Sequence, residues 1–259
     1  IKLHIIPLQP GGMNPFKDLL LFYHLYSLYK GIQPDIVHHI TIKPVMYGSI
    51  AARMANIKSV VNAMSGMGYL YISNQLKVRI IRKFIRILLR FGFNKKNTKL
   101  ILQNPDDLEQ FLSMKVIEKN QISIIKGSGV DECTYEPKSE PENPVTIMLA
   151  ARLLWDKGIL EFIEAARILK DPNIKFILIG DADHNNPKAV DEVEVNAWVE
   201  EGIIEWWGHC TDMHNKLTQS HIVCLPSYRE GLPKILIEAA SCGKPIVSTD
   251  VPGCREIAR

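Results

Sequence analysis

Residues 227–242 have the sequence Ser-Tyr-Arg-Glu-Gly-Leu-Pro-Lys-Ile-Leu-Ile-Glu-Ala-Ala-Ser-Cys, and this stretch decides the fold. The apolar run before it, at 222–225, is typical of a strand buried in a parallel sheet. Pro226 ends that strand, because proline has no N–H to donate to the ladder. Pro233 suits the first turn of a helix and Gly243 its far end, so we predict a helix over 233–242.

Two glutamates flank the start of this predicted helix, Glu230 in the loop before it and Glu238 inside it. A helix start offers unpaired N–H groups and a positive dipole end, which favour a diphosphate. Glu238 lies about 7.5 Å along the axis from Pro233. A carboxylate there suits the two hydroxyls of a ribose, and Glu230 suits the hydroxyls of a transferred sugar. The spacing indicates a nucleotide-sugar site, although a surface helix with two unrelated glutamates explains this motif alone equally well.

A second cluster favours the nucleotide-sugar site. The buried-strand pattern at 145–150 leads into Ala-Arg-Leu-Leu-Trp-Asp-Lys-Gly at 151–158, and a helical pattern follows over 159–169. Arg152 and Lys157 therefore flank a turn at the carboxyl end of a strand, where open α/β sheets bind ligands. Two cations there neutralise a leaving diphosphate without a metal. The alternative, that Arg152 pairs with Asp156 and Lys157 has no such role, is disfavoured beside the first motif.

Both clusters resemble the retaining glycosyltransferases of family 4, which have the GT-B fold. The resemblance covers nearly the whole chain, and its second half is the more specific. Its first half is closest to bacterial enzymes that add a sugar, often an N-acetylhexosamine, to polyprenyl-diphosphate-linked saccharides. The matching stretches are residues 34–39, 41–48, 61–68, 127–131, 152–165 and 226–256.

The resemblance implies an α/β protein of two Rossmann-like domains, whose parallel sheets face each other across a cleft. It implies a UDP-sugar donor held by the second domain and no cofactor. By this resemblance Arg152 and Lys157 stabilise the departing diphosphate, and Glu230 orients the donor sugar. Retention then follows from attack on the face that the diphosphate leaves, with the diphosphate taking the acceptor proton. The remaining donor-binding positions are Gly231, Leu232, Pro233, Glu238 for the ribose, and Gly208 beside the base.

The resemblance also places acceptor or cleft residues in the first domain. These are His39, Ser65, Gly66 and Gly68. Many family members carry histidine where this chain has Ser65. A serine hydroxyl forms hydrogen bonds but is not a general base near neutral pH. Proton transfer by a histidine of that loop is therefore in doubt here. For His39, a packed or solvated histidine is as good an explanation.

The order of predicted elements alternates strands and helices throughout, which indicates parallel sheets with helices on both faces. Residues 136–144 contain three prolines among polar residues, so we predict domains at 1–136 and 137–259. The chain begins without methionine, in a predicted strand at 2–7, and ends where family members continue. The sequence therefore predicts the middle of a longer enzyme.

Composition sets the broad class. The 259 residues, 46% of them hydrophobic, suffice for two domains with cores. The five cysteines show no metal or disulfide spacing, which indicates a reducing, cytoplasmic compartment. No signal peptide and no apolar run of about 18 residues is present. The Asp-Ala-Asp at 181–183 resembles a metal motif of another glycosyltransferase fold. Here it follows a predicted strand, at a position that the resemblance to GT-B proteins makes a turn near the nucleotide, so we predict no metal.

Charge is unevenly distributed between the two halves. Residues 1–138 carry a net charge of +10 and residues 139–259 a net charge of −7, within a total of +3. The predicted helix at 76–91, from Leu76 to Phe91, places five basic residues on one face: Arg79, Arg82, Lys83, Arg86 and Arg90. A basic amphipathic helix predicts binding to an anionic membrane surface, here the inner face of the cell membrane. A solvated face of a core helix is the competing explanation. Nucleic acid ranks lower, because no aromatic stacking platform accompanies the charge.

Two other functions stay open from the sequence. A UDP-sugar 2-epimerase of the same fold needs carboxylates and histidines lining the cleft, and only the histidines at 38 and 39 qualify. By the resemblance, GT-B enzymes begin with a strand and a glycine-rich turn that help to bind the acceptor, and the sequence lacks that unit. A non-catalytic chain that binds a membrane or a partner enzyme is compatible with this lack. Neither the sugar, the linkage nor the acceptor follows from the residues.

Overall fold

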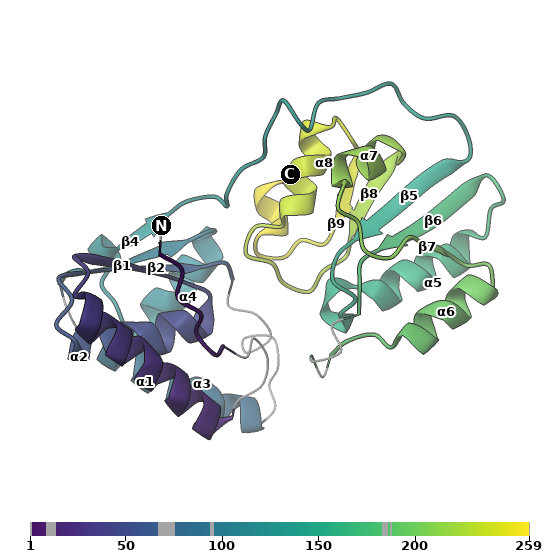
Figure 1. Ribbon diagram of the computed structural model, residues 1–259. Helices are drawn as coiled ribbons and strands as arrows, with labels where there is room; N and C mark the ends of the chain where they lie inside the picture. Colours follow the sequence, from purple (N-terminus) through teal and green to yellow (C-terminus); the bar gives the residue numbers. More distant parts are fainter. Residues whose placement is uncertain are drawn as a thin grey trace. The chain divides into compact units, whose positions relative to one another are not determined.

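The computed structural model divides the chain into two compact units, residues 1–126 and 127–259, each built on one parallel sheet (Figure 1). The residues that it describes are 2–8, 14–66, 76–93, 96–182, 186 and 188–258. The division lies ten residues before the predicted boundary at 136. Residues 127–136 belong with the second unit because Tyr135 packs on its core, and the Tyr135 carbonyl accepts a 2.7 Å hydrogen bond from Ser241.

The first unit has a four-stranded sheet in chain order, β1 to β4. Its strands are β1 (Ile36–Ile40), β2 (Ser59–Met64), β3 (Thr98–Leu102) and β4 (Ile122–Ile124). Its helices are α1 (Pro15–Ile32), α2 (Ser49–Met54), α3 (Leu76–Phe93) and α4 (Pro105–Met114), with the π-type turn η1 (Pro44–Gly48) and the 3-10 turn η3 (Lys119–Gln121).

The described helices of this unit pack on one face of its sheet, not on both as predicted. The buried strand residues, such as Val37, Val60 and Leu100, face these helices, whereas Ile36 and Ile40 on the opposite face are exposed. Right-handed crossovers between strands that follow one another in chain order place α2, α3 and α4 on the same side, and α1 packs there as well, through Leu21, Leu25 and Tyr29. Residues 2–8 form no strand, in contrast to the prediction.

The second unit has a five-stranded sheet in the order β7-β6-β5-β8-β9. Its strands are β5 (Val145–Ala150), β6 (Ile174–Ile179), β7 (Glu205–Trp206), β8 (Ile222–Leu225) and β9 (Ile246–Ser248). Its helices are α5 (Ile159–Leu169), α6 (Glu192–Glu200), α7 (Met213–Thr218) and α8 (Lys234–Ser241), with the 3-10 turns η4 (Trp155–Lys157) and η5 (Cys254–Glu256).

The strand order of this sheet reverses direction between β5 and β8. From β5 the chain moves outward through β6 to β7, then returns to β8 on the other side of β5. The reversal places α5 and α6 on one face, around Phe162, and α7 and α8 on the other, around Leu236. A reversal of this kind opens a crevice outside the carboxyl ends of the two central strands, where open α/β sheets bind ligands.

Candidate active site

Two of the four charged residues singled out from the sequence, Lys157 and Glu230, meet at this reversal. Lys157 closes the turn after β5, and Glu230 lies in the loop after β8. Lys157 Nζ lies 2.5 Å from Glu230 Oε1, and the two side chains are only 18% and 12% exposed. A charge-assisted bond of this length, shielded from water, fixes both side chains at the edge of the sheet.

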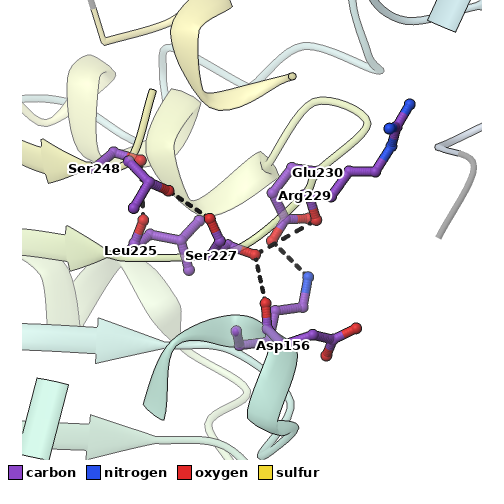
Figure 2. A network of polar contacts seen from close by, with 8 residues as sticks. Asp156, Leu225, Ser227, Arg229, Glu230 and Ser248 are labelled. Carbon is purple, nitrogen blue, oxygen red and sulfur yellow. Dashed lines mark hydrogen bonds and ion pairs between the residues drawn. The ribbon is translucent and has the colours of Figure 1, made fainter. Parts of the chain in front are cut away.

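The loops that carry this pair are joined by hydrogen bonds to one backbone carbonyl (Figure 2). The Asp156 carbonyl accepts hydrogen bonds from the Ser227 hydroxyl at 3.1 Å and from the Tyr228 amide at 3.0 Å. Gly158 has φ +76°, and a Cβ there would overlap the Pro226 carbonyl, so the two loops approach too closely for any other residue.

A third loop supports Glu230 from the β9 side. The Glu230 amide donates to the Pro252 carbonyl at 3.1 Å. Gly253 has φ +84°, and a Cβ on it would lie 2.7 Å from the Glu230 carbonyl oxygen. Burial raises the pKa of the Cys254 thiol, which also interacts electrostatically with Glu230 and Lys157. The position of Glu230 therefore depends on three strand ends.

Glu238 lies inside α8, as predicted, and Pro233 is the residue immediately before that helix. Glu238 is 5% exposed, and Lys234 one turn earlier approaches its carboxylate at 3.2 Å. Burial, followed by the neighbouring Glu238 carboxylate, raises the pKa of Tyr135 to about 12. The Tyr135 hydroxyl thus stays protonated beside a carboxylate at neutral pH.

Arg152 and Glu238 line one cavity of about 420 Å³ at the carboxyl ends of β5 and β6. Gly180, Asp181, His209 and Ile235 also line it. A Cβ on Gly180 would overlap the Ala151 carbonyl, and the Gly180 amide donates to the Gly208 carbonyl at 2.9 Å. Closely packed backbone at Gly180, a cation and a carboxylate therefore all contribute to the lining of this cavity.

Four of the cavity residues named above were not among the predicted site residues: Gly180, Asp181, His209 and Ile235. Gly180 directly follows the buried strand β6, a position typical of close backbone approach, and this signal was available in the sequence. Asp181 was considered only as half of a metal motif, whose second half at 183 lies outside the described residues. Ile235 gave no sequence signal. Among the described residues, no group of three or more histidines, cysteines or acids is arranged to hold a metal.

The predicted acceptor residues of the first unit differ in how exposed they are. Ser65, which is exposed, and Gly66, which is half-buried, follow β2 directly, and Gly68 lies outside the described residues. His39 is 4% exposed, with Nδ1 2.8 Å from Asn62 Oδ1 and Nε2 2.8 Å from the Tyr29 hydroxyl. An amide oxygen only accepts, so Nδ1 carries the proton.

Burial lowers the pKa of His39, against the hydrogen bond to Asn62 that raises it. His39 is therefore a neutral core histidine in this structure, with both ring nitrogens occupied. Its predicted contact with a substrate stays a prediction, and a direct contact would require this buried network to open.

Chemically, the site in the second unit combines the Lys157–Glu230 pair with a cavity that Arg152 and Glu238 line. Lysine and arginine suit phosphate oxygens. Carboxylates suit sugar hydroxyls, because an ionised carboxylate accepts hydrogen bonds at both oxygens.

Comparisons with known proteins identify the family. Residues 144–259 match a family model described as glycosyl transferases group 1, and residues 1–104 match one described as glycosyl transferase 4-like. An N,N'-diacetylbacillosaminyl-diphospho-undecaprenol alpha-1,3-N-acetylgalactosaminyltransferase of Campylobacter jejuni is 30% identical, over 99% of this chain and 69% of its own length. A UDP-Gal:alpha-D-GlcNAc-diphosphoundecaprenol alpha-1,3-galactosyltransferase of Escherichia coli is 26% identical, over 98% of this chain and 67% of its own.

A solved structure agrees in fold. The Anabaena protein HepE, crystallised with UDP, superposes with a TM-score of 0.71 at 19% identity, over 92% of this chain and 65% of its own. The GT-B fold expected from the sequence is thereby confirmed. The named relatives are transferases, and none of them supports the epimerase alternative. This chain belongs to the family 4 glycosyltransferases, as a hexosyltransferase of the GT-B fold.

Proposed function

We propose that this protein transfers a hexose, an N-acetylhexosamine, from a UDP-sugar to a polyprenyl-diphosphate-linked saccharide in surface glycan synthesis. The observation that carries the proposal is the shielded Lys157–Glu230 pair at the switch point of the second sheet, next to a cavity lined by Arg152 and Glu238. Two relatives that span nearly the whole chain act, by their names, on diphospho-undecaprenol-linked sugars, which supports this acceptor class.

Each charged residue takes one part of the donor. Lys157 and Arg152 hold the diphosphate, and Glu238 accepts the ribose hydroxyls. Glu230 keeps one carboxylate oxygen on Lys157 and offers the other to a hydroxyl of the sugar. The backbone from Gly231 to Pro233 and the carbonyl side of Gly208 complete the donor site. No metal and no cofactor takes part, because the two cations neutralise the diphosphate.

The reaction breaks the bond between sugar C1 and the diphosphate oxygen. An acceptor hydroxyl forms the new bond to C1 from the same face, and its proton passes to the departing diphosphate, which leaves as UDP. Lysine and arginine placed where charge develops lower the barrier, because they stabilise the leaving group more than the substrate. The loop after β2, with Ser65 and Gly66, is assigned to the acceptor.

The direct test is UDP release from a panel of UDP-sugars, with and without polyprenyl-diphosphate saccharides, followed by NMR of the product's anomeric configuration. We expect release that depends on acceptor, with the donor configuration retained. Absence of UDP release with every donor would overturn the proposal. A product whose anomeric configuration is inverted relative to the donor would overturn its stereochemical part. Release without an acceptor that yields no saccharide product would indicate hydrolysis instead.

We propose further that α3 holds the protein on the inner face of the cell membrane. The structure divides the apolar residues of this helix between two faces. Val78, Ile85 and Leu89 are buried in the core, whereas a second stripe is exposed. The exposed stripe is Ile80 at 63%, Phe84 at 49%, Ile87 at 62% and Phe91 at 47%. Phe84 and Phe91 therefore lie at the surface of the unit and not in its core.

Basic residues lie beside this stripe along the length of α3. Arg79, Lys83, Arg86 and Arg90 are exposed. An open groove next to the end of α3 continues the basic surface with Lys96, Lys99, Lys115 and Lys119. Apolar side chains beside many cations match a leaflet of anionic lipid, where each lysine or arginine near the surface contributes about 1 kcal/mol. Within the described residues no helix is long and apolar enough to cross a membrane.

The membrane proposal predicts a specific loss of binding. Replacing Phe84 and Ile87 by serine should weaken co-sedimentation with phosphatidylglycerol vesicles by at least tenfold, because each buries apolar area worth about 1.5–3 kcal/mol. Ile168→Ser, at an 81% exposed position of α5, is the matched control and should leave binding unchanged. Equal binding by all variants, or binding to neutral vesicles as strong as to anionic ones, would contradict this surface. Tighter binding to RNA than to vesicles would instead favour nucleic acid as the partner of this surface.

A further inference from the structure

The Lys157–Glu230 pair is assembled from loops that are 73 residues apart in the chain, so something must fix their separation. The strands β5 and β8 are paired only through Ile147–Ile222 and Met148–Val223. Both pairs lie near the start of β8, while the charged residues lie beyond the strand ends. Strand pairing therefore does not set the distance between Lys157 and Glu230, and contacts between the loops must do so.

Besides the Lys157–Glu230 pair itself, Ser227 makes a side-chain contact between these loops. Its side chain is completely buried, at 0% exposed, and its hydroxyl lies 3.1 Å from the Asp156 carbonyl. Asp156 directly precedes Lys157, and Ser227 stands three residues before Glu230. The Arg229 carbonyl lies at 3.4 Å from the same hydroxyl. A hydroxyl has one hydrogen, so the shorter contact, to Asp156, is the main one.

The position of Ser227 is itself constrained from the β9 side. Thr249 donates its hydroxyl to the Ser227 carbonyl, and Ser248 donates to the Leu225 carbonyl at 2.9 Å (Figure 2). The Ser227 hydroxyl thus connects a backbone anchored on β9 to the turn after β5. A hydroxyl used this way acts on geometry, because it touches neither charged side chain.

We infer that Ser227 is a positioning residue, which sets the separation of Lys157 and Glu230 and thereby the fit of the donor's diphosphate and sugar. This inference rests on the proposed function of the pair. Without the hydroxyl, the Asp156 carbonyl keeps the Tyr228 amide, so the fold persists. The Asp156 carbonyl is then held by one hydrogen bond where two had held it, and the spacing of the Lys157–Glu230 pair is less firmly fixed.

The test is a double-mutant cycle on kcat/KM for the UDP-sugar, with Ser227→Ala and Glu230→Gln. Ser227→Ala alone should lower kcat/KM about tenfold, the value of a hydrogen bond of roughly 1.4 kcal/mol. In the Glu230→Gln background the same substitution should change kcat/KM by less than about twofold, because the geometry it protects is already lost. Non-additivity of this kind is not expected of a residue that only stabilises the fold.

Ser220 provides a matched control at the opposite end of β8. It is 1% exposed, and its hydroxyl donates to the Leu217 carbonyl at 2.8 Å. Ser220→Ala should leave kcat/KM within about twofold in both backgrounds while lowering Tm as much as Ser227→Ala. The positioning role is overturned if Ser227→Ala costs the same factor in both backgrounds, or no more than Ser220→Ala. If Glu230→Gln itself leaves kcat/KM unchanged, the proposed function of the pair fails, and the Ser227 inference fails with it.

Discussion

Glu230→Gln separates the two jobs that the structure gives to this carboxylate. The substitution keeps the size of the side chain and one acceptor oxygen but removes the charge opposite Lys157. Exposed ion pairs contribute about 0.2–1 kcal/mol, and breaking a fully buried one costs about 3–5 kcal/mol. With side chains 12% and 18% exposed, this pair lies between the two cases. Since glutamine still accepts a hydrogen bond, we expect the free energy of unfolding to fall by about 1–2 kcal/mol.

The effect on the donor should differ between UDP and the UDP-sugar. A sugar hydroxyl bonded to a charged group contributes about 1.5–3 kcal/mol, so kcat/KM should fall roughly 10- to 150-fold. UDP lacks the sugar, and Lys157 released from its ion pair is fully available to the diphosphate. The affinity for UDP should therefore stay equal or rise. Isothermal titration calorimetry with UDP, beside initial rates with the UDP-sugar, measures both quantities.

Glu164→Gln is the matched control for this experiment. Its carboxylate lies 2.6 Å from Arg167, nearly the distance of the Lys157–Glu230 pair, but its side chain is 50% exposed and lies on α5. It should cost less than about 1 kcal/mol of stability and leave the rates unchanged. Equal losses of UDP and UDP-sugar binding in Glu230→Gln would refute the reasoning, because they would show that the carboxylate only maintains the site. Unchanged rates would refute it as well.

Three further predictions follow from the packing and charge of the two units. Gly158→Ala, which places a methyl group against the Pro226 carbonyl at φ +76°, should lower stability by about 2–4 kcal/mol, whereas Gly202→Ala, at φ +72° with open space, should cost about 1 kcal/mol, both by thermal unfolding. Burial lowers the pKa of His39, so the contribution of this histidine to stability is complete above its unfolded-state pKa of 6.5 and is lost as the pH falls below that value. Tm should therefore drop between pH 7.5 and pH 5.5, and it should drop less steeply in His39→Gln. A flat or rising Tm would contradict this. Vesicle binding through α3 should weaken as salt is raised to 0.5 M, because exposed charges are screened, and insensitivity to salt would exclude the basic face.

Local sequence patterns were sufficient to predict most elements of the fold. The strands at 145–150 and 222–225 and the helix at 159–169 were predicted with the bounds that the structure shows. Each has a local cause, a short apolar run of strand length or apolar residues at helical spacing. Residues 2–7 met the same local pattern but form no strand, because a strand needs a partner and Leu3 and Ile5 are exposed at 84% and 91%.

The candidate site was predictable only in part, for a topological reason. Lys157 and Glu230 were each assigned from the turn that follows a strand. Their mutual ion pair was not predicted, because it depends on β8 lying next to β5, which no local pattern specifies. Ser227 was missed for the same reason, since its partner Asp156 is 71 residues away. On α3, helical periodicity places Phe84 among the apolar residues of the helix, and only the packing of the unit shows that it lies at the surface.

A crystal structure of this protein with UDP bound would show directly whether the second unit holds the donor. We expect the diphosphate to contact Lys157 and Arg152 at hydrogen-bond distance and the ribose hydroxyls to contact the Glu238 carboxylate. We also expect the uracil beside Gly208. UDP bound elsewhere, or bound here with its ribose away from Glu238, would contradict the assignment of the second unit as the donor site.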